Sequence, residues 1–163
     1  MRWRLITPVG VLAAPAIYAA QFMTIEQAQH AAFPAATEFV AIDLSSAPGI
    51  DAATQAWQAR AGGRSLGYVL FDRAIGKTRE IDYSVAIGAD GAVLAVEILE
   101  YRESHGGEVR LESWRKQFQG KRASDPIELG RDIQNISGAT LSCRHVTEGV
   151  KRLLAIHKSI ARR

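Results

Sequence analysis

Residues 80–100, EIDYSVAIGADGAVLAVEILE, carry the strongest fold signal in the chain. The apolar side chains of Ile81, Tyr83, Val85 and Ile87 occupy alternate positions, and this period of two predicts a strand with one buried face. Asp90-Gly91 follows at once, and an Asp-Gly pair between two β-rich runs is typical of a tight hairpin turn. We therefore predict that residues 80–88 pair antiparallel with residues 92–100.

Upstream of this hairpin, the sequence predicts two helices and two further strands. Thr24, followed three positions later by Gln27, has the form of a capping box, so a helix should run from there to about Ala32. The other expectations are a strand over 39–44, a helix over 51–60 that Asp51 caps and Gly62-Gly63 ends, and a strand over 66–71.

Downstream of the hairpin, residues 103–107 (ESHGG) are expected to form a loop and residues 109–119 a helix. The pattern of residues 127–135 is ambiguous, and a short strand is one interpretation. Residues 140–158 predict a long amphipathic helix, because apolar residues recur at spacings of three, four and seven. Together these elements predict a single α+β domain with an antiparallel sheet, packed helices and a long C-terminal helix.

The composition of the 163 residues excludes several classes of protein. A hydrophobic content of 47% suits one compact domain and argues against disorder. The formal charge of +3 falls to +1 if Arg2 and Arg4 are removed, so no nucleic-acid partner is expected. The single cysteine, Cys143, rules out an intrachain disulfide, and the four histidines lack the spacing of a metal site.

The first nineteen residues have the pattern of a secretory signal peptide. Arg2 and Arg4 precede an apolar or small-residue stretch over 5–18, and cleavage is expected after Ala19. An uncleaved membrane anchor is the alternative, although the stretch is shorter than the roughly 20 residues that span a bilayer. Both interpretations place the folded domain in the periplasm or another extracytoplasmic space.

A run of small residues lies directly before the C-terminal helix, in the sequence NISGATLS over 135–142. Such a run places backbone amides and hydroxyl groups at a helix N-terminus, where unpaired N–H groups and the helix dipole favour a bound anion such as phosphate. From the spacing alone, an ordinary helix cap is the more usual role of these residues.

Residues 137–142, SGATLS, resemble the flavinylation motif of the FMN-binding domain family. Members of this family include the C subunit of the sodium-pumping NADH:quinone reductase, the G subunit of the Rnf complex and the periplasmic domain of nitrous-oxide reductase regulators. The likeness extends over most of residues 22–156, through the segments 22–29, 91–103 and 114–121. It implies an FMN-binding domain over 22–163.

The resemblance implies that Thr140 carries FMN in a phosphoester, placed there from FAD by an FAD-dependent flavin transferase. The other cofactor-binding residues that it implies are Ser137, Gly138, Ala139, Leu141 and Ser142 around the motif, with Glu103 and His105 in a flavin-side loop. The loop sequence ESHGG departs from the Thr-Pro-Gly-Leu-Gly type of the respiratory pumps, which puts a pump-subunit role in doubt.

The expected function is therefore relay of electrons between the covalent FMN and a membrane-bound redox partner. No acid, base or nucleophile constellation accompanies the motif, which favours a carrier over an enzyme. A small extracytoplasmic flavin reductase and a cofactor-free exported adaptor are the two alternatives. Tyr101, Trp114 and Phe118 could wall the flavin ring, but core packing is the commoner role for such residues, as it is for Cys143.

Overall fold

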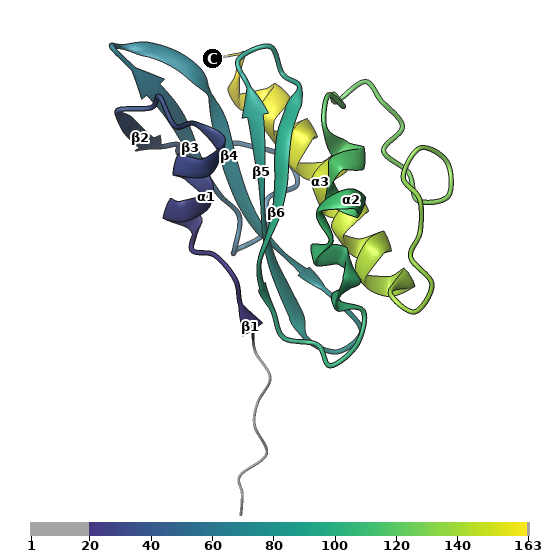
Figure 1. The fold of residues 1–163 in the computed structure, drawn as a ribbon. Coiled ribbons are helices and arrows are strands. Elements are labelled where there is room, and N and C mark those ends of the chain that lie inside the picture. Colours follow the sequence, from purple (N-terminus) through teal and green to yellow (C-terminus); the bar gives the residue numbers. More distant parts are fainter. Residues whose placement is uncertain (1–19, 163) are drawn as a thin grey trace, which may run out of the picture.

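The computed structural model describes residues 20–162, and the predicted signal segment 1–19 lies outside the described residues. A six-stranded antiparallel sheet with the strand order β1-β6-β5-β4-β3-β2 forms the centre of the domain (Figure 1). The strands are β1 (Ala20–Gln21), β2 (Glu38–Ala41), β3 (Gln55–Ala61), β4 (Arg64–Ile75), β5 (Glu80–Gly88) and β6 (Val93–Tyr101). The α+β class predicted from the sequence is confirmed.

The predicted hairpin is present with the expected pairing, β5 with β6. The Gly88 amide donates to the Ala92 carbonyl at 2.9 Å, and the Asp90 carboxylate accepts the Ala92 amide at 3.2 Å. All side chains of β5 after Glu80 are buried. These include the side chains on the face opposite the alternating apolar residues, which the sequence pattern did not predict to be buried. The reason is that helices cover both faces of the sheet.

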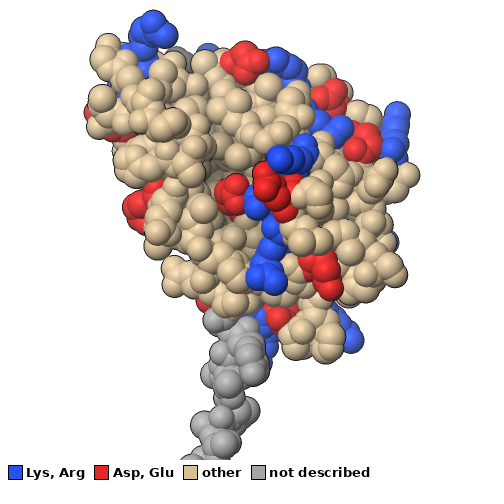
Figure 2. Space-filling view, in the orientation of Figure 1, with Lys and Arg blue, Asp and Glu red and all other residues tan. Residues whose placement is uncertain are grey.

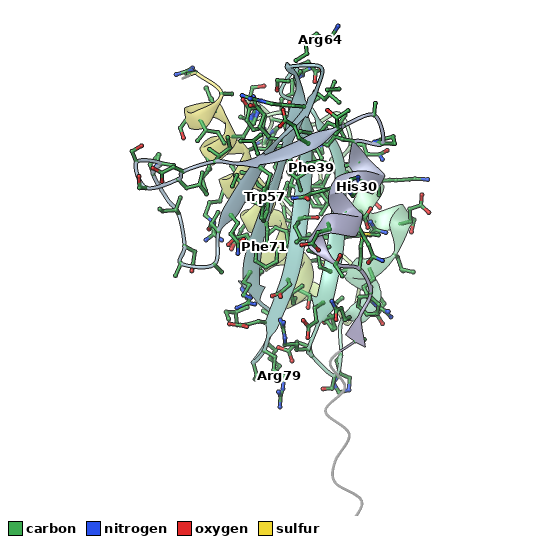
Figure 3. All side chains as sticks on the ribbon, turned by 90° about the vertical axis from the view of Figure 1, so that its left-hand side faces the viewer. His30, Phe39, Trp57, Arg64, Phe71 and Arg79 are labelled. Carbon is green, nitrogen blue, oxygen red and sulfur yellow. The ribbon has the colours of Figure 1, made fainter. Side chains whose placement is uncertain are left out.

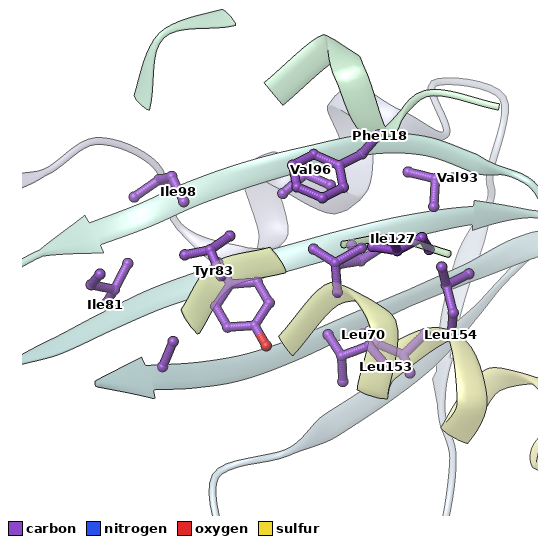
Figure 4. Close-up of a cluster of buried hydrophobic side chains, with 14 of the residues drawn as sticks. Leu70, Ile81, Tyr83, Val93, Val96, Ile98, Phe118, Ile127, Leu153 and Leu154 are labelled. Carbon is purple, nitrogen blue, oxygen red and sulfur yellow. The ribbon is translucent and has the colours of Figure 1, made fainter. Parts of the chain in front are cut away.

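Helix α3 (Thr140–Ile160) packs on one face of the sheet together with a short helical segment after β6. Side chains from the sheet, this segment and α3 form the main core (Figure 4). The largest fully buried members are Leu70, Ile81, Tyr83, Ile87, Phe118, Ile133, Leu153, Leu154 and Ile156. Helix α3 matches the helix predicted over 140–158.

Helix α1 (Ile25–Ala32) covers the opposite face and begins with the predicted capping box. The Thr24 hydroxyl accepts the Gln27 amide at 3.2 Å, and the Gln27 side chain accepts the Thr24 amide at 2.8 Å. Near the end of this helix, the His30 ring meets the Phe39 ring edge-to-face at 5.1 Å between centroids (Figure 3).

The helix predicted over 51–60 is wrong, because residues 55–61 form strand β3. This strand pairs with β2 on one side and β4 on the other, so its backbone donors and acceptors are satisfied by sheet neighbours. The pairing overrides the helix propensity of its Ala and Gln residues. Gly62 and Gly63 do not end a helix; both adopt positive φ (56° and 77°) and turn the chain into β4.

Two other segments differ from expectation. The helix predicted over 109–119 is broken into η1 (Gly107–Arg110), α2 (Glu112–Arg115) and η2 (Lys116–Phe118), because Leu111 has the extended backbone angles φ −57° and ψ 125°. Residues 127–135 form a loop whose only ladder contact among the described residues is an isolated bridge between Leu129 and Ile133.

A buried polar network joins the middle of α3 to the sheet. The fully buried Asp72 carboxylate accepts from the Thr54 hydroxyl at 3.1 Å, from the Tyr83 hydroxyl at 3.1 Å and from the Arg152 guanidinium. Gly149 makes room for it, since a Cβ there would lie 2.0 Å from the Tyr83 hydroxyl oxygen. The Nε of Arg152 is the one buried side-chain polar atom of the described chain without a partner.

The two ends of the sheet carry different segments. Figure 3 labels Arg64, in the β3–β4 hairpin, and Arg79, in the β4–β5 turn, at opposite ends of the molecule. Arg79 lies at the end where β1 and the chain entry are found. On the face seen in Figure 2, acidic and basic side chains are interspersed, in keeping with the small net charge.

Candidate cofactor site

Thr140 is the first residue of α3, and its hydroxyl does not cap the helix. The N-cap position belongs to Ala139, and no side chain makes a capping hydrogen bond there. The Thr140 side chain is exposed, and its Oγ1 accepts from the Asn135 side-chain amide at 3.0 Å. The Cys143 amide is the first of the helix to bond back, to the Ala139 carbonyl at 2.9 Å. The three amides before it have no carbonyl partner within the helix.

The other motif residues divide into exposed and buried positions. Ser137 and Gly138 form an exposed turn, which the Ala139 amide closes by donating to the Ile136 carbonyl at 3.0 Å. Ala139 itself is buried, whereas Leu141 is 43% exposed. Four motif residues are therefore exposed to solvent at the start of α3: Ser137, Gly138, Thr140 and Leu141.

Ser142 is buried and ties α3 to the loop after β6. Its hydroxyl lies 3.0 Å from the Tyr101 hydroxyl, which also donates to the His105 carbonyl. Gly106 sits against this contact, with φ +82°, and a Cβ there would lie 2.9 Å from the Tyr101 hydroxyl oxygen. Burial raises the pKa of Tyr101, so it remains a neutral hydrogen-bond donor. Ser142 thus holds the loop in place through Tyr101.

Three adjoining cavities surround this loop, and His105 lines all of them. One, of about 520 Å³, extends toward Phe22; another, of about 720 Å³, lies between Gly138 and Leu111. A smaller one of about 230 Å³ is lined by Thr140 and Leu141. The two larger volumes fall within the range of roughly 300–1,000 Å³ that is usual for cofactor sites.

Two of the expected loop residues have different surroundings. Glu103 lines the first cavity but is committed to the β4–β5 turn, since its Oε1 accepts the amides of Lys77 at 2.6 Å and Arg79 at 2.7 Å. Partial burial acts to raise the pKa of Glu103, and these backbone donors outweigh it and lower the pKa. The His105 side chain is exposed, and its Nδ1 lies 3.0 Å from the adjacent Ser104 hydroxyl, while its backbone carbonyl accepts from Tyr101.

Residues that the sequence did not indicate also line the cavities. Phe22 is 42% exposed, and the Arg110 guanidinium lies over its ring at 4.5 Å from the centroid, a cation–π arrangement. Arg110 is held by a hydrogen bond from its Nε to the Gly107 carbonyl at 2.9 Å. Lys77, on the β4–β5 turn, lines the cavity that holds Thr140. No local pattern in the sequence marks these three positions.

The aromatic and thiol candidates lie mainly in the core. Trp114 and Phe118 are buried and stack edge-to-face at 5.2 Å, and neither borders the three cavities. The Trp114 indole donates to the Gln134 carbonyl at 2.8 Å, which anchors the segment before the motif. Cys143 is fully buried, and burial raises the pKa of its thiol. Only Tyr101 of the three aromatic candidates reaches a cavity.

Two other kinds of feature are absent from residues 20–162. No group of three or more His, Cys, Asp or Glu side chains is placed to hold a metal ion in this part of the chain. None of its helices combines the length and the apolar character required to span a bilayer.

Comparison with known proteins agrees with the geometry. The sequence model of the FMN-binding domain matches residues 76–155, from the β4–β5 turn through most of α3. The G subunit of the proton-translocating ferredoxin:NAD(+) oxidoreductase complex of Clostridium ljungdahlii is 31% identical over 103 residues, 58% of this chain and 55% of that protein. The G subunit of the Na(+)-translocating ferredoxin:NAD(+) oxidoreductase complex of Acetobacterium woodii is 26% identical over 113 residues, 63% and 55% of the respective chains.

The chain spans about half the length of these curated relatives. The region that matches the family contains Thr140, the loop after β6 and the turn with Lys77, so it includes every residue that lines the cavity beside Thr140. Residues 76–155 of this chain therefore belong to the FMN-binding domain family.

Proposed function

We propose that this protein is an electron carrier whose FMN is joined by a phosphoester to Oγ1 of Thr140. The observation that carries the proposal is the state of this hydroxyl. It is exposed at the start of a 21-residue helix, borders a cavity and is not used as a helix cap. A threonine retained only for capping would point its oxygen at the amides of the first turn.

The residues of the site suit FMN. The amides at the start of α3 and the helix dipole favour its phosphate, and the cavity of about 520 Å³ offers the aromatic side chains of Phe22 and Tyr101 to an isoalloxazine ring. When bound, FMN supplies one- and two-electron transfer.

Attachment is a group transfer without change of redox state. The Thr140 oxygen forms a bond to the phosphorus of the FMN half of FAD, the diphosphate P–O bond breaks and AMP leaves. The hydroxyl proton must go to a base, and Asn135 cannot accept it, because its amide nitrogen donates to this oxygen. We therefore assign the base to an FAD-dependent flavin transferase.

The names of the relatives favour a carrier within a larger assembly. Both are subunits of ion-translocating ferredoxin:NAD(+) oxidoreductase complexes. A membrane-bound redox partner in an extracytoplasmic space is therefore part of the proposal. A tether suits that setting, since a covalent link keeps the flavin at the site when it would otherwise be diluted away.

Intact mass after co-expression with an FAD-dependent flavin transferase tests the attachment. The wild-type chain should gain the mass of FMN less one water, and Thr140→Ala should gain nothing. Ser65→Ala is the control, since it removes an exposed hydroxyl that lies outside the motif, and it should be modified like the wild type. A flavin on Thr140→Ala, or an unmodified wild-type chain, would contradict the proposal.

Steady-state kinetics separates the carrier from the flavin reductase. The loaded domain should be reduced once by a chemical reductant and reoxidised by an acceptor dye. It should not turn over a nicotinamide donor at a sustained rate. Sustained turnover by the isolated domain would favour the reductase.

A further inference from the structure

Lys77 is a cation that borders the proposed phosphate site. It shares the cavity of about 230 Å³ with Thr140, Gly138 and Leu141. Its ammonium group makes no ion pair or hydrogen bond with any residue of the described chain. Several other cationic side chains do have such partners, for example Lys121, which is paired with Asp132 at 2.8 Å.

A residue of the loop after β6, Glu103, holds the turn that carries Lys77. The Glu103 carboxylate accepts the amides of Lys77, Thr78 and Arg79, and its second oxygen accepts the Thr78 hydroxyl at 3.3 Å. Three converging amides make a site for an anion, and Glu103 already fills it. Of the side chains on this turn, that of Lys77 is the one that borders the cavity with Thr140.

The same turn is fixed from the side of α3. The Nδ1 of His145 lies 3.1 Å from the Gly76 carbonyl oxygen and also contacts the Ile75 carbonyl. Because carbonyl oxygens only accept, this nitrogen is the donor. Gly76 itself is packed against Glu103, since a Cβ there would lie 2.8 Å from Cγ of the glutamate. The backbone before Lys77 is thus fixed to the same helix that begins with Thr140.

We propose that Lys77 is the counter-ion of the phosphate group at Thr140, and that Glu103 and His145 are positioning residues that hold its turn beside the start of α3. The inference rests on the proposed function and adds a binding residue to it. Lys77 would attract the diphosphate of the incoming FAD and afterwards pair with the phosphoester. A charge-assisted contact of this kind adds to the helix N-terminus, whose dipole alone is a weak attractor.

The rate of flavin attachment tests the role of Lys77. Purified unmodified chain is mixed with transferase and FAD, and the mass gain is followed with time. Lys77→Ala should be modified about tenfold more slowly, the effect of losing one charge-assisted contact of about 1.4 kcal/mol. Lys77→Arg should restore most of the rate. Arg79→Ala is the matched control, a cation on the same turn that does not border the cavity, and it should match the wild type.

The ammonium group of Lys77 gives a readout other than the attachment rate. Its NMR signal in the labelled chain should shift when Thr140 carries FMN, because the phosphoester then lies beside it. In Thr140→Ala, treated in the same way, the signal should stay unchanged. An identical Lys77 signal in the loaded and unloaded chains would overturn the proposal.

Glu103→Gln tests the positioning. This variant keeps an acceptor oxygen but loses the charge that gathers the three amides, so it should also slow attachment. The double variant with Lys77→Ala should be no slower than Lys77→Ala alone, because Glu103 acts through Lys77. Additive losses would overturn the positioning role.

The failure of this inference differs from that of the proposed function. A wild-type chain that is never modified removes both. A wild-type chain that is modified at Thr140, together with Lys77→Ala at the same rate, removes only the role of Lys77.

Discussion

The polar groups that meet the middle of helix α3 are buried and paired, whereas the Thr140 hydroxyl at its start is exposed. In the middle, Arg152 reaches the buried Asp72 carboxylate, which also accepts from Thr54 and Tyr83. At the start, Thr140 Oγ1 is exposed, bonds only to an exposed asparagine, and no side chain caps the helix.

The contrast distinguishes a structural polar cluster from the proposed cofactor site. Buried donors and acceptors are mostly paired within the fold, because leaving one unpaired costs roughly 1–3 kcal/mol. In this cluster of the described chain, the Nε of Arg152 is the one buried side-chain atom that has no partner. Exposed donors and acceptors can remain without a protein partner at little cost in free energy, because water solvates them until a ligand binds. A small-residue turn followed by an uncapped helix start therefore points to a ligand only when the hydroxyl is free of the helix, as it is here.

The largest expected effect is on the buried cluster. Asp72→Ala leaves the Thr54 and Tyr83 hydroxyls and the Arg152 guanidinium without their acceptor, so the free energy of unfolding should fall by about 3 kcal/mol. Urea denaturation measures the change. Glu148→Ala, which removes an exposed carboxylate from the same helix, is the control and should change stability by less than about 0.5 kcal/mol. A loss of unfolding free energy below about 1 kcal/mol in Asp72→Ala would contradict the structural role assigned to this buried cluster.

An intermediate effect is expected at Asp132, which is paired but partly exposed. Partial burial acts to raise the pKa of this carboxyl, but the Lys121 ammonium and the amides of Glu128 and Ile127 outweigh it and lower the pKa from 3.8 to about 2. The unfolded chain therefore takes up the proton at higher pH than the folded chain, so protonation favours unfolding.

The stabilisation by Asp132 should be complete above the ordinary pKa and decline as the pH falls from about 4 toward 2. Screening at a partly exposed site limits it to about 1 kcal/mol. The difference in unfolding free energy between wild type and Asp132→Asn, measured at about pH 6 and about pH 3, should shrink at the lower pH. A difference that grows on acidification would have the wrong sign.

The smallest effect is expected at Thr140. Because its hydroxyl does not cap α3, Thr140→Ala should change the unfolding free energy of the unmodified chain by less than about 0.5 kcal/mol. Thr24→Ala is the matched comparison, since Thr24 does cap α1, and it should cost about 1 kcal/mol. Equal losses in the two variants, measured by urea denaturation, would show that Thr140 serves the helix after all.

Local signals in the sequence were sufficient for the elements that they specify. The Asp90-Gly91 turn, the Thr24 capping box and the periodicity of 140–158 each involve residues close in sequence, and all three were predicted correctly. The strand at 55–61 was missed because its conformation is set by two neighbouring strands, against the helix propensity of its own residues.

The site was predictable only in part for the same reason. The motif around Thr140 is contiguous, so a family resemblance could indicate it. Lys77 and Phe22 reach the cavities through contacts between segments far apart in the chain, and their neighbours in sequence give no hint of this. Glu103 was placed correctly on the loop after β6. Its hydrogen bonds to the β4–β5 turn are tertiary contacts that no sequence pattern indicates.

Cys143 gives the protein a natural reporter for opening of this helix end. It is the only cysteine, it lies three residues after Thr140, and its sulfur is fully shielded. A maleimide or disulfide reagent can react with this thiol only when the first turns of α3 detach from the sheet. The labelling rate therefore measures how often this local opening occurs. Comparing the rate with and without flavin would show whether the cofactor fastens the helix start, without any engineered probe.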